Sequence, residues 1–370
     1  MKILAINPGS TSTKIAVYEY GTPVDEERSN DMASSELYSE FSLIKSIPHS
    51  PEDLMRFEKV SHQYDWRKAL IHKELESAGY KLDFDAVVGR GSLAKPVEGG
   101  VYIVSQKMVD DAKNAEHQHA CDLGCILAYD IASEIPGCLS LTADPGVVDE
   151  LCDYARISGS PHCERICIWH ALNQRATARK YAKAIGKRYE DLNLIVCHLG
   201  GGISVAAHEH GRAIDANNAL DGEGPFSPER AGSLPAVSLI NLCFSGKYTQ
   251  DQLLKRIAGH AGLQAHLGTT NVIEIERRIK EGDKKAELIL NAMIYHVAKA
   301  IASEGAVLYG NVDAILITGG MARSNYVVER IIKRVEYMAP VRVFPGENEM
   351  EALVYNAGAV LRGEIEPKQY

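Results

Sequence analysis

Two turns of the sequence combine small polar residues with glycines, and such turns can bind phosphate. The first turn contains Asn7, Gly9, Ser10 and Thr11, and it follows the apolar run at residues 3–6. Glycine lets the backbone approach a ligand closely, and exposed backbone N–H groups attract phosphate oxygens. An alternating run comes next, so we predict a β-hairpin and not the glycine-rich loop that leads into a helix. A plain hairpin turn without a ligand is the alternative interpretation.

The second turn is a near-copy of the first, with His198 at the position of Asn7. Three consecutive glycines lie in it, and glycines weaken a strand end unless something must lie close to the backbone. His198 itself can donate to a phosphate oxygen or be a hydrogen-bonded core histidine. A third glycine turn follows residues 312–318, and the repetition indicates two duplicated lobes with a nucleotide between them. The glycines of the second and third turns are Gly200, Gly201, Gly202, Gly319 and Gly320.

Two arginines lie where they could grip an anion. Arg90 ends a short apolar run and has a glycine on each side, and Arg230 lies on a loop that contains two prolines. A guanidinium group binds carboxylate or phosphate through a planar fork of donors. Two such groups could hold the oxygens of a phosphoryl group during its transfer. For Arg90, a surface ion pair is the alternative role.

Two carboxylates stand at positions that suit a magnesium ion. Asp144 ends an apolar run before a Pro-Gly pair, and Glu349 opens the last predicted helix. Proteins bind Mg2+ through one or two carboxylates together with phosphate oxygens and water. A favourable interaction with the helix N-terminus is the alternative role for Glu349. Asp149 and Glu351 are the nearest alternative ligands.

The remaining candidate groups are histidines and isolated carboxylates. His117 and His119 have the spacing of a zinc-binding pair, and His170 follows later in the chain. No clear third ligand completes a zinc site, so we favour these histidines as hydrogen-bond donors to an anion. Glu164 and Glu223 belong to no such group, and we expect both to be solvated.

Strands and helices that position these residues alternate along the chain, which is typical of an α/β fold. We predict hairpins over residues 1–20 and 194–208, and further strands over 34–48, 84–89, 138–142, 312–318 and 341–344. Predicted helices cover residues 51–79, 105–134, 169–186, 232–257, 324–338 and 348–362, with one or two long helices from Glu274 to Leu308. Ser50, as a cap, and Gly79, as a stop, support the first helix.

Composition limits the class of protein. The chain of 370 residues has a net charge of −9 and no dense basic run, so we expect no nucleic-acid partner. No apolar stretch reaches about 18 residues and no signal peptide is evident, so we expect a cytoplasmic protein without a membrane segment. The length predicts two domains, divided near residues 150–165, and we expect 1–160 and 161–370. We expect the eight cysteines to be buried, reduced thiols, with Cys121/Cys125 and Cys163/Cys167 each on one helical face.

Taken together, these motifs resemble the acetokinase family, and within it the butyrate kinases. Acetate kinases typically carry F-H-G-T-S-H and H-L-G-N-G where this chain has W-H-A-L-N and H-L-G-G-G, which favours the butyrate kinase side. The resemblance covers essentially the whole chain. Its segments are INPGSTSTKIAVY, VVGRGSL, EHQHACDLG, LTADPGVVDEL, IWHALNQRATAR, HLGGGISVAAH, EGPFSPERAGSLP, ILITGGMA and FPGENEMEAL.

The resemblance implies two duplicated actin-like, ribonuclease H-like domains with a nucleotide cleft between them. Residues 1–160 would form the acyl-substrate side and residues 161–370 the adenosine side, with the last helix packing back on the N-terminal domain. The implied reaction is reversible transfer of a phosphoryl group from ATP to a short-chain fatty acid, giving an acyl phosphate and ADP. Mg2+ is the implied metal, and a homodimer the implied assembly.

The resemblance also implies roles for individual residues. Arg90 and Arg230 would bind the acyl carboxylate and stabilise the transition state, and His170 and His198 would contact phosphate oxygens. The remaining implied roles are Asn7 near the transferred phosphoryl group, Asp144 as the catalytic or metal-organising aspartate, Glu349 binding magnesium, His119 in the acyl pocket and the glycines lining the nucleotide. The role of Asp122 stays open. An acetate, propionate or isobutyrate kinase, a sugar kinase and a slow ATPase binding module are the alternatives.

Overall fold

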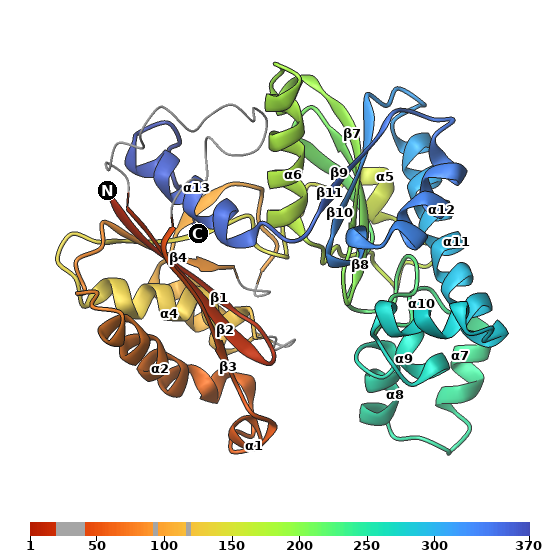
Figure 1. Ribbon diagram of the computed structural model, residues 1–370, viewed down its shortest axis with the longest axis horizontal. Coiled ribbons are helices and arrows are strands. Elements are labelled where there is room, and N and C mark those ends of the chain that lie inside the picture. Colours follow the sequence, from red (N-terminus) through yellow and green to blue (C-terminus); the bar gives the residue numbers. More distant parts are fainter. Residues whose placement is uncertain (20–40, 92–94, 116–119) are drawn as a thin grey trace. The chain divides into compact units, whose positions relative to one another are not determined.

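The structure is a computed structural model that describes residues 1–19, 41–91, 95–115 and 120–370. The chain forms two compact units, one of Met1–Val148 with Asn348–Tyr370 and one of Asp149–Glu347. Each unit has its own β-sheet covered by helices (Figure 1). Among the helices that the structure describes, none combines the length and apolar character needed to cross a membrane.

The first unit is built on a seven-stranded sheet in the order β12-β5-β6-β4-β1-β2-β3. Strands β1 to β3 form an antiparallel meander, and β4 and β6 run parallel to β1. The candidate residues of this unit therefore follow the carboxyl ends of neighbouring parallel strands. The strands are β1 (Lys2–Pro8), β2 (Ser12–Glu19), β3 (Phe41–Pro48), β4 (Ala86–Arg90), β5 (Val101–Ile103), β6 (Leu139–Ala143) and β12 (Lys368–Gln369).

Side chains of β1 point alternately to the two faces of the sheet in the first unit, and each face is covered by helices. Leu4 and Ile6 join one core with α2 and α4, so the intervening Ile3 and Ala5 face the opposite side of the sheet, where α13 packs. In Figure 1, α2 and α4 lie on one side of β1 and α13 on the other. The helices are α1 (Pro51–Leu54), η2 (Val60–Gln63), α2 (Tyr64–Ser77), α3 (Gln106–Lys113), α4 (Asp122–Ser133) and α13 (Glu349–Leu361).

The second unit has a five-stranded sheet in the order β11-β10-β7-β8-β9. Ile195 and Cys197 of β7 join the core formed with α11 and α12, whereas Leu194 and Val196 pack with α6 on the other face. The strands are β7 (Asn193–Leu199), β8 (Ile203–Glu209), β9 (Arg212–Ala216), β10 (Ala314–Gly319) and β11 (Val341–Pro345). The helices are α5 (Asp153–Arg156), α6 (Ala171–Ala184), η3 (Tyr189–Asp191), α7 (Ala236–Cys243), α8 (Gln250–Ile257), α9 (Gly262–Leu267), α10 (Val272–Lys280), α11 (Lys284–Val307), η4 (Gly320–Arg323) and α12 (Asn325–Val335).

The two sheets share one topology. Strands β7, β8, β9, β10 and β11 follow one another and pair as β1, β2, β3, β4 and β6 do in the first unit. The next long helix of each repeat packs in the other unit. Helix α6 follows β6 along the chain but covers β7 and β10, and α13 follows β11 but covers β1 and β4.

Most predicted elements are confirmed, but three predictions of a continuous long helix are wrong. The predicted helix 51–79 is interrupted between α1 and η2, where Lys59 adopts an extended conformation, although Ser50 caps α1 as expected. The predicted helix 232–257 is interrupted between α7 and α8 by a turn with Gly246 at φ 71°. The predicted helix 105–134 is two helices, α3 and α4. Of the predicted strand 34–48, residues 34–40 lie outside the described residues.

The cysteine prediction holds only in part. None of the eight cysteines, all of which lie in the described residues, forms a disulfide, but Cys163 and Cys243 are exposed. Cys121 directly precedes α4 and Cys125 lies within it. Cys163 and Cys167 lie outside any helix, so the predicted shared helical face is wrong for that pair.

Candidate functional site

In the first unit, the structure brings Asn7, Arg90 and Glu349 together. Asn7 and Arg90 end the neighbouring parallel strands β1 and β4, and Glu349 is the first residue of α13. The Asn7 amide donates to Glu349 Oε2 at 2.6 Å, and Arg90 Nη2 lies 2.9 Å from Glu349 Oε1. Asn7 and Glu349 are buried, whereas the Arg90 side chain is 28% exposed. This arrangement leaves a cation partly open to water and held by a buried carboxylate.

Asp144 directly follows β6, which is the parallel strand next to β4 in the sheet. It is buried and has φ 39°, a left-handed conformation that non-glycine residues seldom adopt. Asp144 Oδ1 accepts a 2.8 Å hydrogen bond from the Gly100 N–H, and Gly100 O accepts one from Asp144 N. Unusual backbone conformations of this kind concentrate at functional sites, and two hydrogen bonds stabilise this one.

Close backbone packing explains the glycines on either side of Arg90. A Cβ on Gly89 would lie 1.9 Å from the carbonyl oxygen of Gly124, and one on Gly91 would lie 2.4 Å from Pro145 Cβ. Both distances are far below van der Waals contact, so only glycine fits at these two positions. The strand end that carries Arg90 therefore packs directly against α4 and the Asp144 loop.

Arg67 stabilises the first glycine turn by hydrogen bonds, a role that the sequence analysis missed. Arg67 of α2 is 1% exposed, and its Nη1 donates to the carbonyl of Gly9 at 2.9 Å and to Thr13 Oγ1 at 3.0 Å. Burial lowers the pKa of Arg67 to about 10, which keeps it protonated at neutral pH. Ser10 and Thr11 are exposed at the tip of the turn. Nothing in the local sequence marks Arg67, because its partners are distant in the chain.

In the second unit, His170 and His198 lie face to face. Their rings are nearly parallel, with centroids 3.8 Å apart. His198, near the end of β7, is fully buried, and neither of its ring nitrogens has a hydrogen-bond partner among the described residues. Buried polar atoms are nearly always hydrogen-bonded, so a group of this kind needs an explanation. A bound anion would supply the missing partner.

A chain of hydrogen bonds fixes the ring of His170. Tyr189 OH contacts His208 Nδ1 at 2.6 Å, and His208 Nε2 contacts Gln174 Oε1 at 3.1 Å. Gln174 Nε2 then donates to Ser204 Oγ at 2.8 Å, which leaves the serine hydrogen for His170 Nδ1, also at 2.8 Å. Burial lowers the pKa of His208 to about 3, so this ring stays neutral. The chain places the proton of neutral His170 on Nε2, as a hydrogen-bond donor.

The three consecutive glycines are braced by the loop that carries Arg230. Ser227 Oγ donates to the Gly201 carbonyl at 2.5 Å. A Cβ on Gly202 would lie 2.1 Å from Arg230 Nη1, so the guanidinium group lies against the glycine backbone. Arg230 Nη1 also donates to the carbonyl of Ala219 at 2.6 Å.

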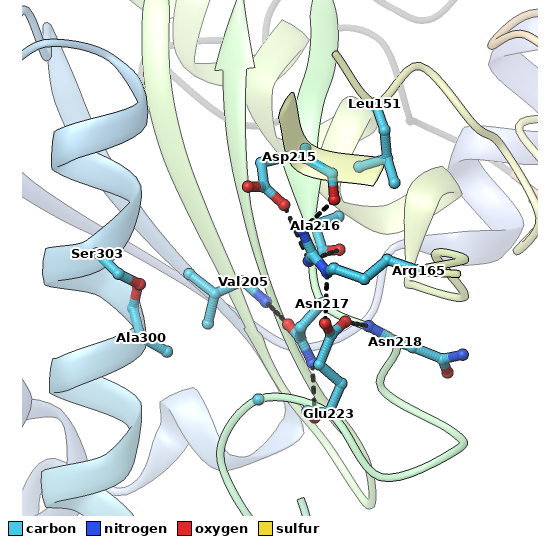
Figure 2. A network of polar contacts seen from close by, with 12 residues as sticks. Leu151, Arg165, Val205, Asp215, Ala216, Asn217, Asn218, Glu223, Ala300 and Ser303 are labelled. Carbon is cyan, nitrogen blue, oxygen red and sulfur yellow. Dashed lines mark hydrogen bonds and ion pairs between the residues drawn. The ribbon is translucent and has the colours of Figure 1, made fainter. Parts of the chain in front are cut away.

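A network around Arg165 joins Asp215 to Glu223 (Figure 2), at the two ends of the segment that contains Ala219. Arg165 Nε donates to Glu223 at 2.6 Å and Nη2 to Asp215 at 3.1 Å. The Asn217 side chain links β8 to the same loop by accepting from Val205 N and donating to the carbonyl of Glu223. The prediction that Glu223 is solvated is therefore wrong, because Arg165 pairs with it across 58 positions of sequence. The sequence analysis also missed Arg165.

The third glycine turn ends β10, beside β7. Thr318 is paired in register with His198, and its hydroxyl lies within hydrogen-bond distance of Asn173 Oδ1 and of the Gly346 carbonyl, at 3.2 Å each. Gly319 has φ 93° and exchanges two backbone hydrogen bonds with Gly346. A Cβ on Gly320 would meet nothing within 4 Å. This turn is therefore tied down at Gly319 and open at Gly320.

Some candidates cannot be placed in either group. His119 and His117 lie outside the described residues. Asp122 is buried at the start of α4. Glu164 is exposed. Within the described ranges there is no group of three or more histidine, cysteine, aspartate or glutamate side chains that could hold a metal by themselves.

Comparison with known proteins decides the family. Residues 165–352 match the acetokinase family. A probable butyrate kinase from Bacteroides thetaiotaomicron is 56% identical over 370 residues, which cover 100% of both chains. The chain belongs to the acetokinase family. Another relative, a probable butyrate kinase from Phocaeicola vulgatus, is 49% identical to this acetokinase-family chain, covering 100% of it and 99% of the relative.

Membership of the acetokinase family makes the chain a carboxylate kinase, a phosphotransferase that uses ATP and ADP. Its structure is similar to Porphyromonas gingivalis acetate kinase, with a TM-score of 0.75, 17% identity, and coverage of 97% of this chain and 100% of that one. The structure is also similar to Entamoeba histolytica acetate kinase, with a TM-score of 0.73, 15% identity, and coverage of 98% of this chain and 100% of that one. The shared fold and the repeated sheet topology confirm the predicted class of two actin-like, ribonuclease H-like α/β domains.

Proposed function

We propose that this acetokinase-family chain is a butyrate kinase, which transfers the γ-phosphoryl group of ATP reversibly to butyrate. A carboxylate oxygen attacks the γ-phosphorus while the bond to the β,γ-bridging oxygen breaks, giving butyryl phosphate and ADP. The carboxylate is already ionised at neutral pH, so no base has to remove a proton. Catalysis then depends on alignment and on stabilising the charge of the transferred group. Two relatives named probable butyrate kinase support this choice of substrate.

The observation that carries the proposal is His198, a fully buried imidazole without a hydrogen-bond partner in the described structure. It lies at the end of a strand, 3.8 Å by ring centroids from His170, whose hydrogen bonds present Nε2 as a donor. Carboxyl ends of parallel strands are the usual ligand-binding edge of an α/β sheet. A phosphate group satisfies both rings, so we assign His170 and His198 to phosphate oxygens.

The two arginines take different parts in the proposed reaction. Arg90 would bind the butyrate carboxylate and then neutralise charge on the transferred group, with its orientation set by Glu349 and Asn7. Arg230 would stabilise the transferred phosphoryl group from the second unit, where Gly202 and Ala219 fix its guanidinium. Fixed cations of this kind stabilise a transition state because they need no rearrangement during the reaction. Asn7 would lie near the transferred group, and His119 is proposed for the acyl pocket.

The glycine turns would hold the nucleotide. Glycine backbone at each turn allows close approach by phosphate oxygens. We assign this role to Gly9, Ser10, Thr11, Gly200, Gly201, Gly202, Gly319 and Gly320. Residues of the first unit would then serve the acyl substrate, and those of the second unit the adenosine side.

Magnesium is the metal that we propose for the nucleotide, and the residues present are compatible with it. Mg2+ keeps several waters and needs only one or two protein carboxylates, so a large ligand cluster is not required. Glu349 accepts from Asn7 and Arg90, and Asp144 accepts from Gly100. Both are carboxylates, the type of protein ligand that Mg2+ binds directly or through water. The bound ion would draw charge from the phosphate oxygens.

Trapping of acyl phosphate with hydroxylamine tests the reaction and its substrate together. The protein is incubated with ATP, magnesium and one acid at a time, from acetate to valerate and including isobutyrate. We expect the highest kcat/KM with butyrate. A maximum with acetate, propionate or isobutyrate would change the substrate while keeping the carboxylate kinase. One methylene changes binding by only about 1–3 kcal/mol, so several acids will react.

Helix α7 supports the proposal that the chain forms a homodimer. No residue of this described helix is buried; Val237 and Ile240 are 71% and 56% exposed, and Phe244, the residue that follows the helix, is 86% exposed. These residues recur at helical spacing and form one apolar face, and exposed apolar patches commonly mark interfaces. We expect a dimer by light scattering and a monomer for Phe244→Ser. If the Phe244→Ser variant is still a dimer, the interface does not lie at α7.

A further inference from the structure

Glu347 is a partly exposed glutamate of the second unit, beside the third glycine turn. It follows Gly346, which is tied to Gly319 by two backbone hydrogen bonds of 3.1 and 3.0 Å. Glu347 Oε1 is 3.5 Å from His198 Nε2. The glutamate side chain is 40% exposed, whereas that of His198 is 1% exposed. The carboxylate thus covers the buried imidazole from the solvent side.

The same carboxylate borders the glycine turn. A Cβ on Gly200 would lie 3.4 Å from Glu347 Oε1 and 2.8 Å from His198 Nε2. Glu347 is therefore next to two of the features assigned to phosphate, His198 and the Gly200 backbone. A phosphate group bound by these features would approach the glutamate carboxylate.

A bound phosphate and the Glu347 carboxylate are both negatively charged, and two neighbouring anions repel each other unless a cation lies between them. Neither ring nitrogen of His198 makes a hydrogen bond within the described residues, so the ring can donate to a phosphate oxygen, yet the Glu347 carboxylate lies 3.5 Å from the same imidazole. A divalent cation bound to the phosphate oxygens resolves this conflict, since it is attracted by both groups. Mg2+ typically binds through phosphate oxygens, water and one or two carboxylates.

We propose that Glu347 is a binding residue for the divalent cation of the bound nucleotide, either directly or through a coordinated water. His198 then faces the phosphate oxygens, and Glu347 faces the ion that they carry. The inference rests on the proposed function, because it requires a nucleotide at these turns.

Metal-dependent nucleotide binding tests the role of Glu347. The full-length protein and its Glu347→Gln variant are titrated with Mn2+ and ADP, and bound Mn2+ is followed by electron paramagnetic resonance. Binding of ADP without metal is measured by calorimetry in EDTA. We expect Glu347→Gln to lose at least about tenfold in affinity for Mn2+-ADP. Its affinity for metal-free ADP should be unchanged or higher, because an adjacent negative charge has been removed.

Glu336→Gln is the matched control, because Glu336 is an exposed glutamate of the same unit at the end of α12. Equal Mn2+-ADP affinity in the natural protein and Glu347→Gln overturns the inference. An equal loss with and without metal also overturns it, since the carboxylate would then only orient His198. If the natural protein binds no ADP in either condition, the proposed function fails and the inference fails with it. Circular dichroism confirms that each variant is folded.

Discussion

The side-chain amide of Asn7 donates a 2.6 Å hydrogen bond to Glu349, which lies 342 positions later in the chain. This bond joins the end of the first strand to the start of the last helix. Arg90 meets the other oxygen of the same carboxylate at 2.9 Å. Glu349 therefore orients the arginine that we assign to the acyl carboxylate.

Replacing Glu349 by Gln should reduce both activity and stability. The variant keeps the shape of the side chain but removes the charge opposite Arg90 and presents an amide to Asn7. We expect kcat to fall by about 100-fold or more. We expect unfolding free energy to fall by about 1–3 kcal/mol, below the usual range for a buried pair because Arg90 is partly exposed. Steady-state kinetics and urea unfolding measure both, and Glu366→Gln, an exposed glutamate, is the control. Unchanged turnover would contradict the role of Glu349.

Adding one methyl group at Gly202 should displace Arg230. The new Cβ would lie 2.1 Å from Arg230 Nη1, so the guanidinium group must move. We expect Gly202→Ala to lower kcat by at least about tenfold while the melting temperature changes little, because the arginine is at the end of a side chain. At Gly159 a Cβ would meet nothing within 4 Å, and Gly159→Ala is the control. Full activity in Gly202→Ala would show that this position of Arg230 is not the catalytic one.

Glu223 should act on catalysis only through Arg230. Its carboxylate pairs with Arg165 (Figure 2). This pair holds the loop whose Ala219 carbonyl accepts from Arg230. We expect Glu223→Gln to lower kcat by about tenfold with a smaller change in KM for the acid. The decisive measurement is a double-mutant cycle. In an Arg230→Ala background, Glu223→Gln should cost almost nothing further, because coupled residues are not additive. If the losses in kcat from Glu223→Gln and Arg230→Ala are additive, Glu223 does not act through Arg230.

Glu304 should make the stability of the protein depend on pH. This carboxyl group of α11 is buried, and burial together with the nearby Asp215 raises its pKa from 4.5 to about 8. The native protein therefore keeps a proton that the unfolded chain releases. The associated stability is complete below pH 4.5 and is lost as pH rises through about 8. The slope for one such group is at most about 1.4 kcal/mol per pH unit.

Glu304→Gln should remove this dependence, because glutamine resembles the protonated acid. Urea unfolding at pH 5, 7 and 9 compares the variant with the natural protein. The two should be similar at pH 5, and the variant should be the more stable at pH 9. A constant difference across the three values would mean that Glu304 does not titrate in this range.

Local sequence patterns were sufficient to predict the elements that carry the site. Apolar runs followed by glycine turns marked the ends of β1, β7 and β10, and these are the strand ends at which Asn7, His198 and Thr318 lie. Glycine content also carries information about tight packing, as at Gly202. Where a residue's role depends on its own segment, the sequence was informative.

Residues that act across long sequence distances could not be predicted in this way. Arg67 supports the first turn from 58 positions away, and Arg165 reaches Glu223 across the same separation. An arginine within a helix or loop gives no sign that its partner is a distant carbonyl or carboxylate. The breaks in the predicted helices were missed for a related reason, since tertiary packing decides which helical pattern continues.

The crossing of α13 from the second repeat to the sheet of the first has a consequence for biosynthesis. The first unit includes Asn348–Tyr370, so the face of its sheet that α13 covers stays uncovered until this segment has been made. Leu353 and Ala357 of α13, both fully buried, supply the apolar cover for that face. A ribosome-bound chain of the first half therefore cannot complete its core, and a nascent chain released early would expose an aggregation-prone surface. Folding of the first unit therefore has to wait until α13 has been synthesised.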